Sequence, residues 1–248
     1  MFPLPYSREL STALYALAGL NLTLLVSGLA LGKLSQDGTG RLPRPLRMTL
    51  SGILVLAALL GWLWGARGTP IVLYAAVIFF GMAAGFLGDL IMARLIPVPN
   101  RLVFGMIAFG VGHVLYSAAF LLIALQFGLN RTHIHLLILA PLLLFSLWVW
   151  LQHIRKPGGS RAINAGSLVY GVLIAIMTTL ALALAAQNRH LFGLGLGAVL
   201  FLVSDLTLGN WQVRGHVWKS VNDVIWTAYV IGQLLIVHSV AAVLNILR

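Results

Sequence analysis

Three carboxylates occupy positions where a chain of this composition usually excludes charge. The sequence has five acidic residues, and Asp89, Asp205 and Asp223 lie within or at the ends of long apolar runs. A carboxylate at the centre of a membrane helix costs about 2.5–3.5 kcal/mol on the insertion scale. Acidic residues in such places commonly mark functional sites, so acid–base chemistry is the first possibility. Glu9 and Asp37 lie in the N-terminal segment and a loop, where a solvated role is sufficient.

Polar residues from separate runs are expected to meet in one half of the molecule. At a rise of about 1.5 Å per residue, Asp89 lies about 9–10 Å, and Asp205 about 6–8 Å, inside the same end of their runs. His113 is deeper, about 16 Å from that end, and shares a helix face with Tyr116 three residues later. Taken singly, each residue has a structural explanation. The convergence of Asp89, His113 and Asp205 favours a site.

The last apolar run carries a polar stripe. Steps of four, three and four residues place four side chains on one helix face: Asn222, Trp226, Tyr229 and Gln233. Lipid cannot satisfy polar groups, so this face should line a wet or ligand-filled cavity. At the start of the same run we expect Asp223 to cap the helix beside Lys219.

The composition indicates the elements that must position these residues. The chain is 60% hydrophobic and only 8% charged, whereas a soluble domain carries about 25% charged residues. Apolar runs long enough to span a bilayer cover residues 10–31, 46–64, 70–96, 102–127, 135–151, 163–186, 191–209 and 221–247. Their length and lack of two-residue alternation favour helices over strands. We therefore predict an all-α, polytopic membrane helix bundle of about eight transmembrane helices, forming one integral-membrane domain over residues 1–248.

The spacing of the glycines and the absence of cysteine indicate how the helices pack and which kinds of site the chain cannot form. Gly81 and Gly85 are four residues apart, a spacing that allows close helix packing. We expect the same role for the glycines of "GLGLG", residues 193–197, because no strand precedes them as a dinucleotide-binding loop would require. The chain has no cysteine, which excludes disulfides and thiolate metal sites.

The basic residues are distributed unevenly between alternate gaps. The gaps after odd-numbered runs hold Lys33, Arg41, Arg44, Arg47, Arg94, Arg101, Arg155, Lys156, Arg161, Arg214 and Lys219, whereas the other side holds Arg8, Arg67, Arg131, Arg189 and Arg248. By the positive-inside rule the first set faces the cytoplasm and both termini face outward. Such scattered cations reflect membrane topology and form no phosphate-tracking stripe, so we expect lipid bilayer and not nucleic acid as the partner. A bacterial inner membrane is the expected location.

The order of several short motifs resembles one known family. "GFLGDLIM", "GVGHVLYSAAF", "AVLFLVSDLTLG" and "WTAYVIGQLLIV" are similar to segments of the YhhN-like lysoplasmalogenases, over about residues 44–236. The matching positions are Gly88-Asp89, His113 with Tyr116, Ser204-Asp205, and Tyr229 with Gln233; "LVYGVLIAIM", from Leu168, is similar to the family's sixth span. The sequence departs where Arg44-Pro45 replaces Lys-Pro and where Ala228-Tyr229 replaces a tyrosine pair.

The resemblance implies hydrolysis of the vinyl ether of a lysoplasmalogen, a single-chain lysophospholipid, to a fatty aldehyde and a glycerophospho-head-group. Acid hydrolysis of an enol ether needs one carboxyl group that donates a proton and a second that stabilises the cation and activates water. We assign Asp89 and Asp205 to this pair in an order left open, with His113 to hold or relay a proton. The expected substrate-binding residues are Tyr116, Ser204, Asn222, Tyr229 and Gln233. Arg94, Arg101 and Lys219 are expected to meet the lipid phosphate, and Phe86 and Phe109 to flank the tail.

Two other functions fit parts of the pattern. A metal-dependent intramembrane lipid hydrolase would require Asp89, Asp205 and His113 as ligands, although zinc sites are commonly richer in histidine. A proton-coupled transporter would also place carboxylates inside the membrane, but no inverted repeat is evident. We therefore predict a hydrolase that needs neither cofactor nor metal, with the metal-dependent hydrolase and the transporter as alternatives.

Overall fold

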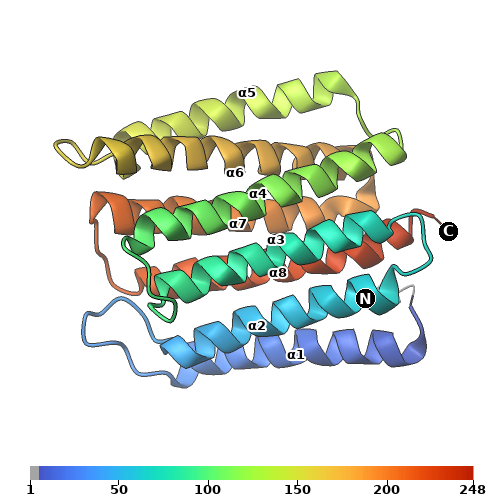
Figure 1. Cartoon of the computed structure of the whole chain (residues 1–248), viewed down its shortest axis with the longest axis horizontal. Helices are drawn as coiled ribbons and strands as arrows, with labels where there is room; N and C mark the ends of the chain where they lie inside the picture. Colours follow the sequence, from blue (N-terminus) through green and yellow to red (C-terminus); the bar gives the residue numbers. More distant parts are fainter. Residues whose placement is uncertain (1–5, 248) are drawn as a thin grey trace.

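The computed structural model describes residues 6–247, and every long element in that range is a helix (Figure 1). The helices are α1 (Arg8–Leu31), α2 (Arg44–Leu60), α3 (Val72–Met92), α4 (Arg101–Gln126), α5 (Thr132–Val149), α6 (Arg161–Gln187), α7 (Phe192–Gly209) and α8 (Val221–Leu244). With their terminal extensions, eight helices of the described chain are long and apolar enough to cross a membrane. The predicted all-α membrane bundle is confirmed.

Short turns of other helical types extend the spans. The π-helical segments η1 (Gly61–Gly65), η2 (Trp150–Ile154) and η4 (Asn210–Arg214) continue α2, α5 and α7, and the 3₁₀ turn η3 (Arg189–Leu191) precedes α7. The third span is shorter than predicted, because Arg94 adopts a left-handed φ of 61° just after α3 and Pro97 follows. Helix ends are satisfied locally: Asn100 Oδ1 accepts hydrogen bonds from the first backbone N–H groups of α4.

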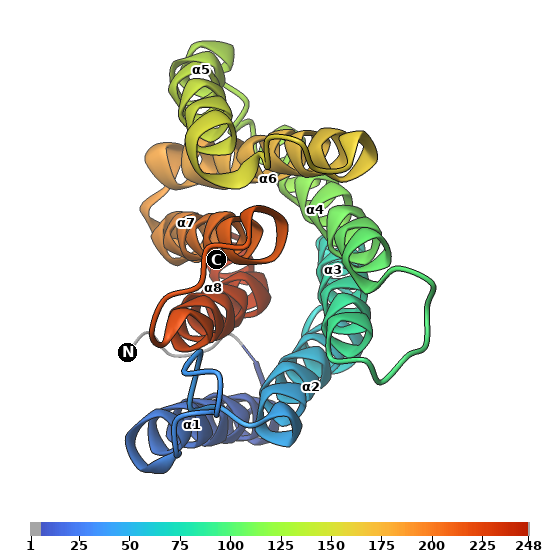
Figure 2. The same ribbon diagram turned by 90° about the vertical axis from the view of Figure 1, so that its left-hand side faces the viewer.

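The helices run nearly parallel to one long axis, with α7 and α8 on the inner side of a curved layer (Figures 1 and 2). Viewed end-on, α1, α2, α3, α4 and α6 follow one another around this curve, and α5 packs against the outside of α6 (Figure 2). Of the eight spans α8 is the most buried and α5 the least. The polar stripe predicted on the last span therefore lies on the central helix of the molecule.

Glycines allow the closest contacts between helices. A Cβ at Gly81 would lie 2.6 Å from the Tyr116 ring, and one at Gly88 would lie 2.8 Å from Phe109, so both glycines let α4 pack against α3. A Cβ added at Gly197 of α7 would lie 2.8 Å from the carbonyl oxygen of Gly232 of α8. One added at Gly232 would lie 2.8 Å from the carbonyl oxygen of Gly197. These contacts confirm the packing role predicted for Gly81 and, within residues 193–197, for Gly197; an added Cβ at Gly193 would meet only an ordinary contact at 3.8 Å.

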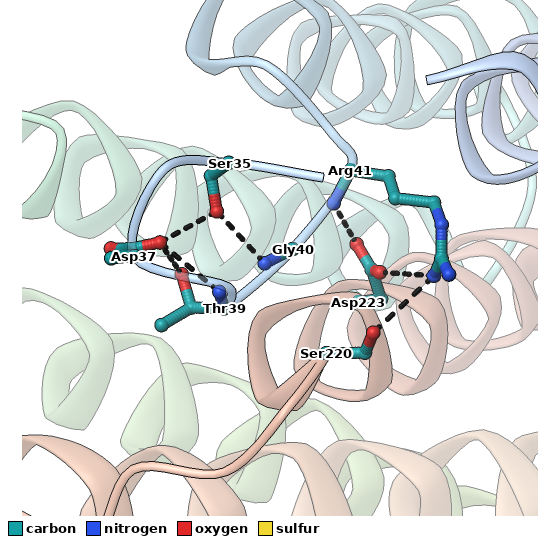
Figure 3. Close-up of polar contacts among 7 residues, drawn as sticks. All are labelled: Ser35, Asp37, Thr39, Gly40, Arg41, Ser220 and Asp223. Carbon is teal, nitrogen blue, oxygen red and sulfur yellow. Dashed lines mark hydrogen bonds and ion pairs between the residues drawn. The ribbon is translucent and has the colours of Figure 1, made fainter. Parts of the chain in front are cut away.

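The loop between α1 and α2 folds onto the start of α8 (Figure 3). Within the loop, Asp37 Oδ1 accepts hydrogen bonds from the Ser35 hydroxyl at 2.6 Å and from the Thr39 backbone N–H and hydroxyl, and these bonds lower the pKa of the Asp37 carboxyl. Arg41 then donates to Asp223 from its backbone N–H at 2.6 Å and from its guanidinium at 3.0 Å.

This loop corrects one prediction about the start of α8. Asp223 does not cap the helix, since the N-cap residue is Ser220 and no side chain makes a capping hydrogen bond there. The Asp223 carboxylate instead pairs with Arg41, 182 residues earlier in the chain, and Lys219 is exposed. The backbone N–H of Asn222 donates to the Thr39 carbonyl at 2.7 Å, so the loop also caps the helix. The basic loops before α2, α4, α6 and α8 lie at this same end of the molecule (Figure 1). Arg248, counted with the opposite end, lies outside the described residues.

Candidate active site

A cavity of about 430 Å³ lies at the end of the bundle that carries the basic loops. Its walls come from α2, α3, α4, α7 and α8 and from the loop before α2. Asp89 of α3 and Asp205 of α7 both line it, although each is only 6–7% exposed. The convergence predicted for these two carboxylates is therefore observed.

Asp89 is held between three helices by hydroxyl groups. Its Oδ2 accepts a hydrogen bond from the Ser51 hydroxyl of α2 at 2.6 Å and another from the Tyr229 hydroxyl of α8 at 2.8 Å. The two hydroxyl oxygens lie 3.4 Å apart. Phe109 packs edge-on against the Tyr229 ring, with 6.5 Å between centroids. Neutral groups thus surround the bound side of this carboxylate.

Asp205 belongs to a second network, which includes a histidine. Its Oδ2 lies 3.1 Å from Nε2 of His113 and accepts a short hydrogen bond from the Tyr170 hydroxyl. Nε2 of His113 also lies 2.9 Å from the Tyr170 oxygen, so histidine, tyrosine and carboxylate form a triangle between α4, α6 and α7. His113 is fully buried and reaches the cavity only through Asp205.

The two carboxylates share one feature that matters for chemistry. In each, Oδ2 makes the hydrogen bonds described above, and Oδ1 has no hydrogen-bond partner among residues 6–247. One oxygen therefore fixes the orientation of the group, and the other is available to a molecule in the cavity. Two carboxyl groups fixed in this way can supply a proton donor and a proton acceptor to one reactant.

The predicted stripe on α8 is only partly exposed to the cavity. Asn222, Trp226 and Tyr229 line the cavity, and so does Ser204 of α7. The Ser204 hydroxyl donates a hydrogen bond to the Ile225 carbonyl at 3.0 Å. Gln233 lies deeper and does not line the cavity; its Oε1 accepts from the Tyr116 hydroxyl at 2.8 Å.

Tyr116 likewise lies outside the cavity, fully buried against Gly81. Nε2 of Gln233 is buried and has no hydrogen-bond partner within the described chain. The hydrogen-bonded pair of Tyr116 and Gln233 therefore does not line the cavity.

The cations at the cavity differ from the predicted set. Arg44, Arg47 and Arg101 line it, whereas Arg94 and Lys219 do not. Arg94, which has a left-handed φ of 61°, lines a separate surface depression with Pro97 and Pro99.

A second, apolar pocket of about 40 Å³ adjoins the cavity between α4, α6 and α7. The two spaces share five lining residues: Met92, Phe109, Asp205, Leu208 and Gln212. Phe109 thus borders both spaces, while Phe86, also expected near a lipid tail, borders neither. Asp205 stands at the junction between a polar space and an apolar one.

The described residues contain no group of three or more histidines, aspartates or glutamates arranged to hold a metal ion. His113 and Asp205 contact each other directly, but Asp89 belongs to a different hydrogen-bond network. The ligand set considered for a metal-dependent hydrolase is therefore not assembled as one cluster.

Several residues of the site were not assigned a role from the sequence, among them Arg44, which also lines the cavity. Ser51 looks like any small residue in an apolar run. Arg47 was counted with the loop cations, but it lies in the first turn of α2 and lines the cavity. The sequence gave one indication that Tyr170 belongs to the site, its place in the segment "LVYGVLIAIM" of the sixth span. Nothing in the neighbouring residues indicates that the Tyr170 hydroxyl reaches Asp205.

Comparison with known proteins adds a family but no individual relative. No curated protein and no solved structure matches the chain. The family description that does match is the YhhN family, over residues 46–240, which include both networks around Asp89 and Asp205. This match covers most of the sequence, and the chain belongs to the YhhN family.

Proposed function

We propose that this membrane protein hydrolyses the vinyl ether bond of a lysoplasmalogen, an alkenyl-glycerophospho-ethanolamine or -choline. The products are a fatty aldehyde and the glycerophospho-head-group. The observation that carries the proposal is the position of Asp205, where the polar cavity meets the apolar pocket. In a lysoplasmalogen the vinyl ether is also the junction between the polar head and the hydrocarbon tail. A lipid with its head in the cavity and only the first carbons of its tail at the pocket places that bond beside Asp205.

The reaction requires a proton on carbon and then a water molecule. A carboxylic acid transfers its proton to the outer alkene carbon, which leaves an oxocarbenium ion at the carbon bonded to oxygen. The second carboxylate stabilises this cation and takes a proton from the attacking water. The resulting hemiacetal breaks its bond to the glycerol oxygen, which is protonated as the aldehyde forms, so that one water is consumed.

The partners of the two carboxylates support a division of roles. Asp205 contacts His113, which can balance a negative charge when the imidazole is protonated. Asp89 has only the neutral hydroxyls of Ser51 and Tyr229 as partners. We therefore assign Asp89 as the proton donor and Asp205 as the carboxylate that stabilises the cation and activates water.

Aldehyde release from a lysoplasmalogen by the purified protein in detergent tests the reaction. The parent protein should release aldehyde, and Asp89→Asn and Asp205→Asn should each lose about 10²–10⁴-fold in rate, the usual contribution of general acid–base catalysis. Glu9→Gln is the matched control, since it makes the same change on an exposed side chain of α1. No aldehyde from a folded, monodisperse parent would refute the proposal, and solute uptake into proteoliposomes without lipid breakdown would favour the transporter.

We also propose that the end carrying the basic loops faces the cytoplasm, in a bacterial inner membrane. Basic loops are retained on the cytoplasmic side during insertion, and the cavity lies at that end. The substrate would then come from the cytoplasmic leaflet of the bilayer.

A further inference from the structure

Arg47 is a cation that lines the cavity and forms no ion pair within the described residues. Its guanidinium donates to Oδ1 of Asn222 at 3.3 Å and stands over the Trp226 ring, 5.5 Å from the centroid. Within residues 6–247 no carboxylate oxygen lies within 4.0 Å of this guanidinium. Its Nε is buried and has no hydrogen-bond partner in the described chain. Since burying an unpaired charge is costly, an arginine fixed in this way is suited to bind an anion in the cavity.

Two more arginines flank the same space. Arg44 donates to the Ala93 carbonyl and Arg101 to the Met92 carbonyl, each at 3.3 Å, so both side chains meet at the C-terminal end of α3. Neither has a carboxylate within 4.0 Å among the described residues. The planar guanidinium presents paired donors that match the oxygens of a phosphate.

The distance from Arg47 to the reacting group fits a glycerophospholipid. Arg47 and Ser51 lie four residues apart on one face of α2, about 6 Å along the helix axis. Ser51 donates to Asp89. A phosphate bound at Arg47 is thus about one helical turn from the Ser51 hydroxyl that holds Asp89. In a lysophospholipid the three-carbon glycerol unit provides a similar separation between phosphate and ether oxygen.

We propose that Arg47, with Arg44 and Arg101, binds the phosphate of the lipid head-group and so sets the position of the ether bond. This inference rests on the proposed function and deepens it. Arg94 and Lys219, which do not line the cavity, take no part in this phosphate binding. Trp226 and Asn222 act as positioning residues, since they fix the Arg47 guanidinium.

The test compares two lipids, one with and one without the phosphate-bearing head-group. A saturated 1-O-alkyl lysophospholipid has no vinyl ether to cleave, and the matching 1-O-alkylglycerol has no phosphate. Affinities for the full-length protein in detergent can be followed by tryptophan fluorescence, because Trp226 stacks on Arg47. The parent protein should bind the phosphate-bearing lipid about 10- to 100-fold more tightly.

Arg47→Gln should lose about 10-fold or more in affinity for the phosphate-bearing lipid and keep its affinity for the alkylglycerol within about 2-fold. Arg47→Lys should fall between parent and Gln variant, because it retains the charge but not the paired donors. Arg161→Gln is the matched control: it removes a cation at the same end of the molecule, outside the cavity, and should bind as the parent does.

Three results separate this inference from its alternatives. Equal losses for both ligands in Arg47→Gln, or no loss for either, would overturn the phosphate site. If inorganic phosphate binds alone with the same dependence on Arg47 while the lipid shows no phosphate preference, the site serves free phosphate and the lipid assignment is wrong. An Arg47-dependent preference for the phosphate-bearing lipid without aldehyde release would support the phosphate site and refute the vinyl-ether reaction. Aldehyde release without this preference would support the reaction and refute the phosphate site.

Discussion

At the scale of single residues, the two carboxylates are distinguished by what fixes each of them. Hydroxyl groups alone hold Asp89, whereas a histidine and a tyrosine hold Asp205. The two carboxylates therefore differ in their hydrogen-bond partners: those of Asp205 include an ionisable imidazole, whereas those of Asp89 are neutral hydroxyl groups. The difference allows one site to contain an acid and a base, as paired carboxylates do in glycoside hydrolysis.

The Tyr170 hydroxyl is the residue-scale feature most open to a direct test. Tyr170→Phe removes its hydrogen bond to Asp205 and its contact with His113 but keeps the ring. We expect kcat for aldehyde release to fall about 10- to 100-fold, because a hydrogen bond to a charged group is lost, with KM within about 2-fold. Steady-state kinetics on the purified variant measure both constants.

The control for this prediction is Tyr74→Phe. The Tyr74→Phe variant also loses a buried hydrogen bond, the one between the Tyr74 and Ser239 hydroxyls at 2.5 Å. Residue 74 lies outside the cavity, in the first turn of α3, so this variant is a control for the loss of a buried bond. It should lower stability by about 1 kcal/mol and leave kcat unchanged. If Tyr170→Phe instead behaved like Tyr74→Phe, the tyrosine would have only a structural role.

At the scale of the helices, the α3–α4 contact positions the site, and it depends on glycine. Gly81→Ala should destabilise the protein by about 1–3 kcal/mol, the usual cost of overpacking, because the new methyl group would lie 2.6 Å from the Tyr116 ring. That ring cannot easily shift, because its hydroxyl donates a hydrogen bond to Gln233 and the ring stacks on that of Phe120, with 6.2 Å between the ring centroids. Thermal unfolding in detergent would show the effect as a lower Tm.

Gly19→Ala provides the comparison within the same fold. Gly19 lies on the exposed side of α1, with nothing within 4 Å of an added Cβ. Alanine there should be neutral or stabilise the helix by up to about 1 kcal/mol. A Gly81→Ala variant as stable as Gly19→Ala would mean that α4 can move away from α3 without cost.

Much of this helical scaffold could be predicted from the sequence, because span length and hydrophobicity are local properties. The eight spans, the depth of Asp89 and Asp205 and the packing glycines all follow from counting along single helices. The partners of those carboxylates do not, since Ser51 and Tyr170 lie 38 and 35 residues away in sequence. Arg94 shows a related limit: sequence position gave its end of the bundle, but Arg94 does not line the cavity, and its left-handed φ of 61° is a backbone property that the sequence does not reveal.

At the scale of the whole molecule, one loop connects the first helical pair to the central helix. Asp223 accepts from both the backbone and the guanidinium of Arg41, and the loop between α1 and α2 lines the cavity through Ser35, Asp37 and Thr39 (Figure 3). Asp223→Ala should therefore increase amide hydrogen exchange in residues 34–42, while exchange in α3 and α7 stays unchanged. Mass spectrometry of peptides from the detergent-solubilised protein can measure this.

Arg41→Gln should have a smaller effect on the same peptides. The Arg41 side chain is 37% exposed, and a pair of this kind contributes less than about 1 kcal/mol after solvent screening. The Arg41 backbone N–H keeps its bond to Asp223 in this variant. Equal exchange in Asp223→Ala and the parent would show that the backbone bonds from Ser220 and Asn222 to the loop are sufficient alone.

The orientation of the entire bundle can be tested because the chain has no cysteine. Single cysteines at Gln36, in the loop before α2, and at Asn130, in the loop before α5, would be exposed at opposite ends. The basic residues gather at the Gln36 end, so the positive-inside rule places it in the cytoplasm. A membrane-impermeant maleimide should label Asn130→Cys in bacterial cells whose inner membrane is accessible from outside, and Gln36→Cys only in inverted vesicles. The reverse pattern would place the cavity on the outer face, so that substrate would have to come from the outer leaflet of the membrane.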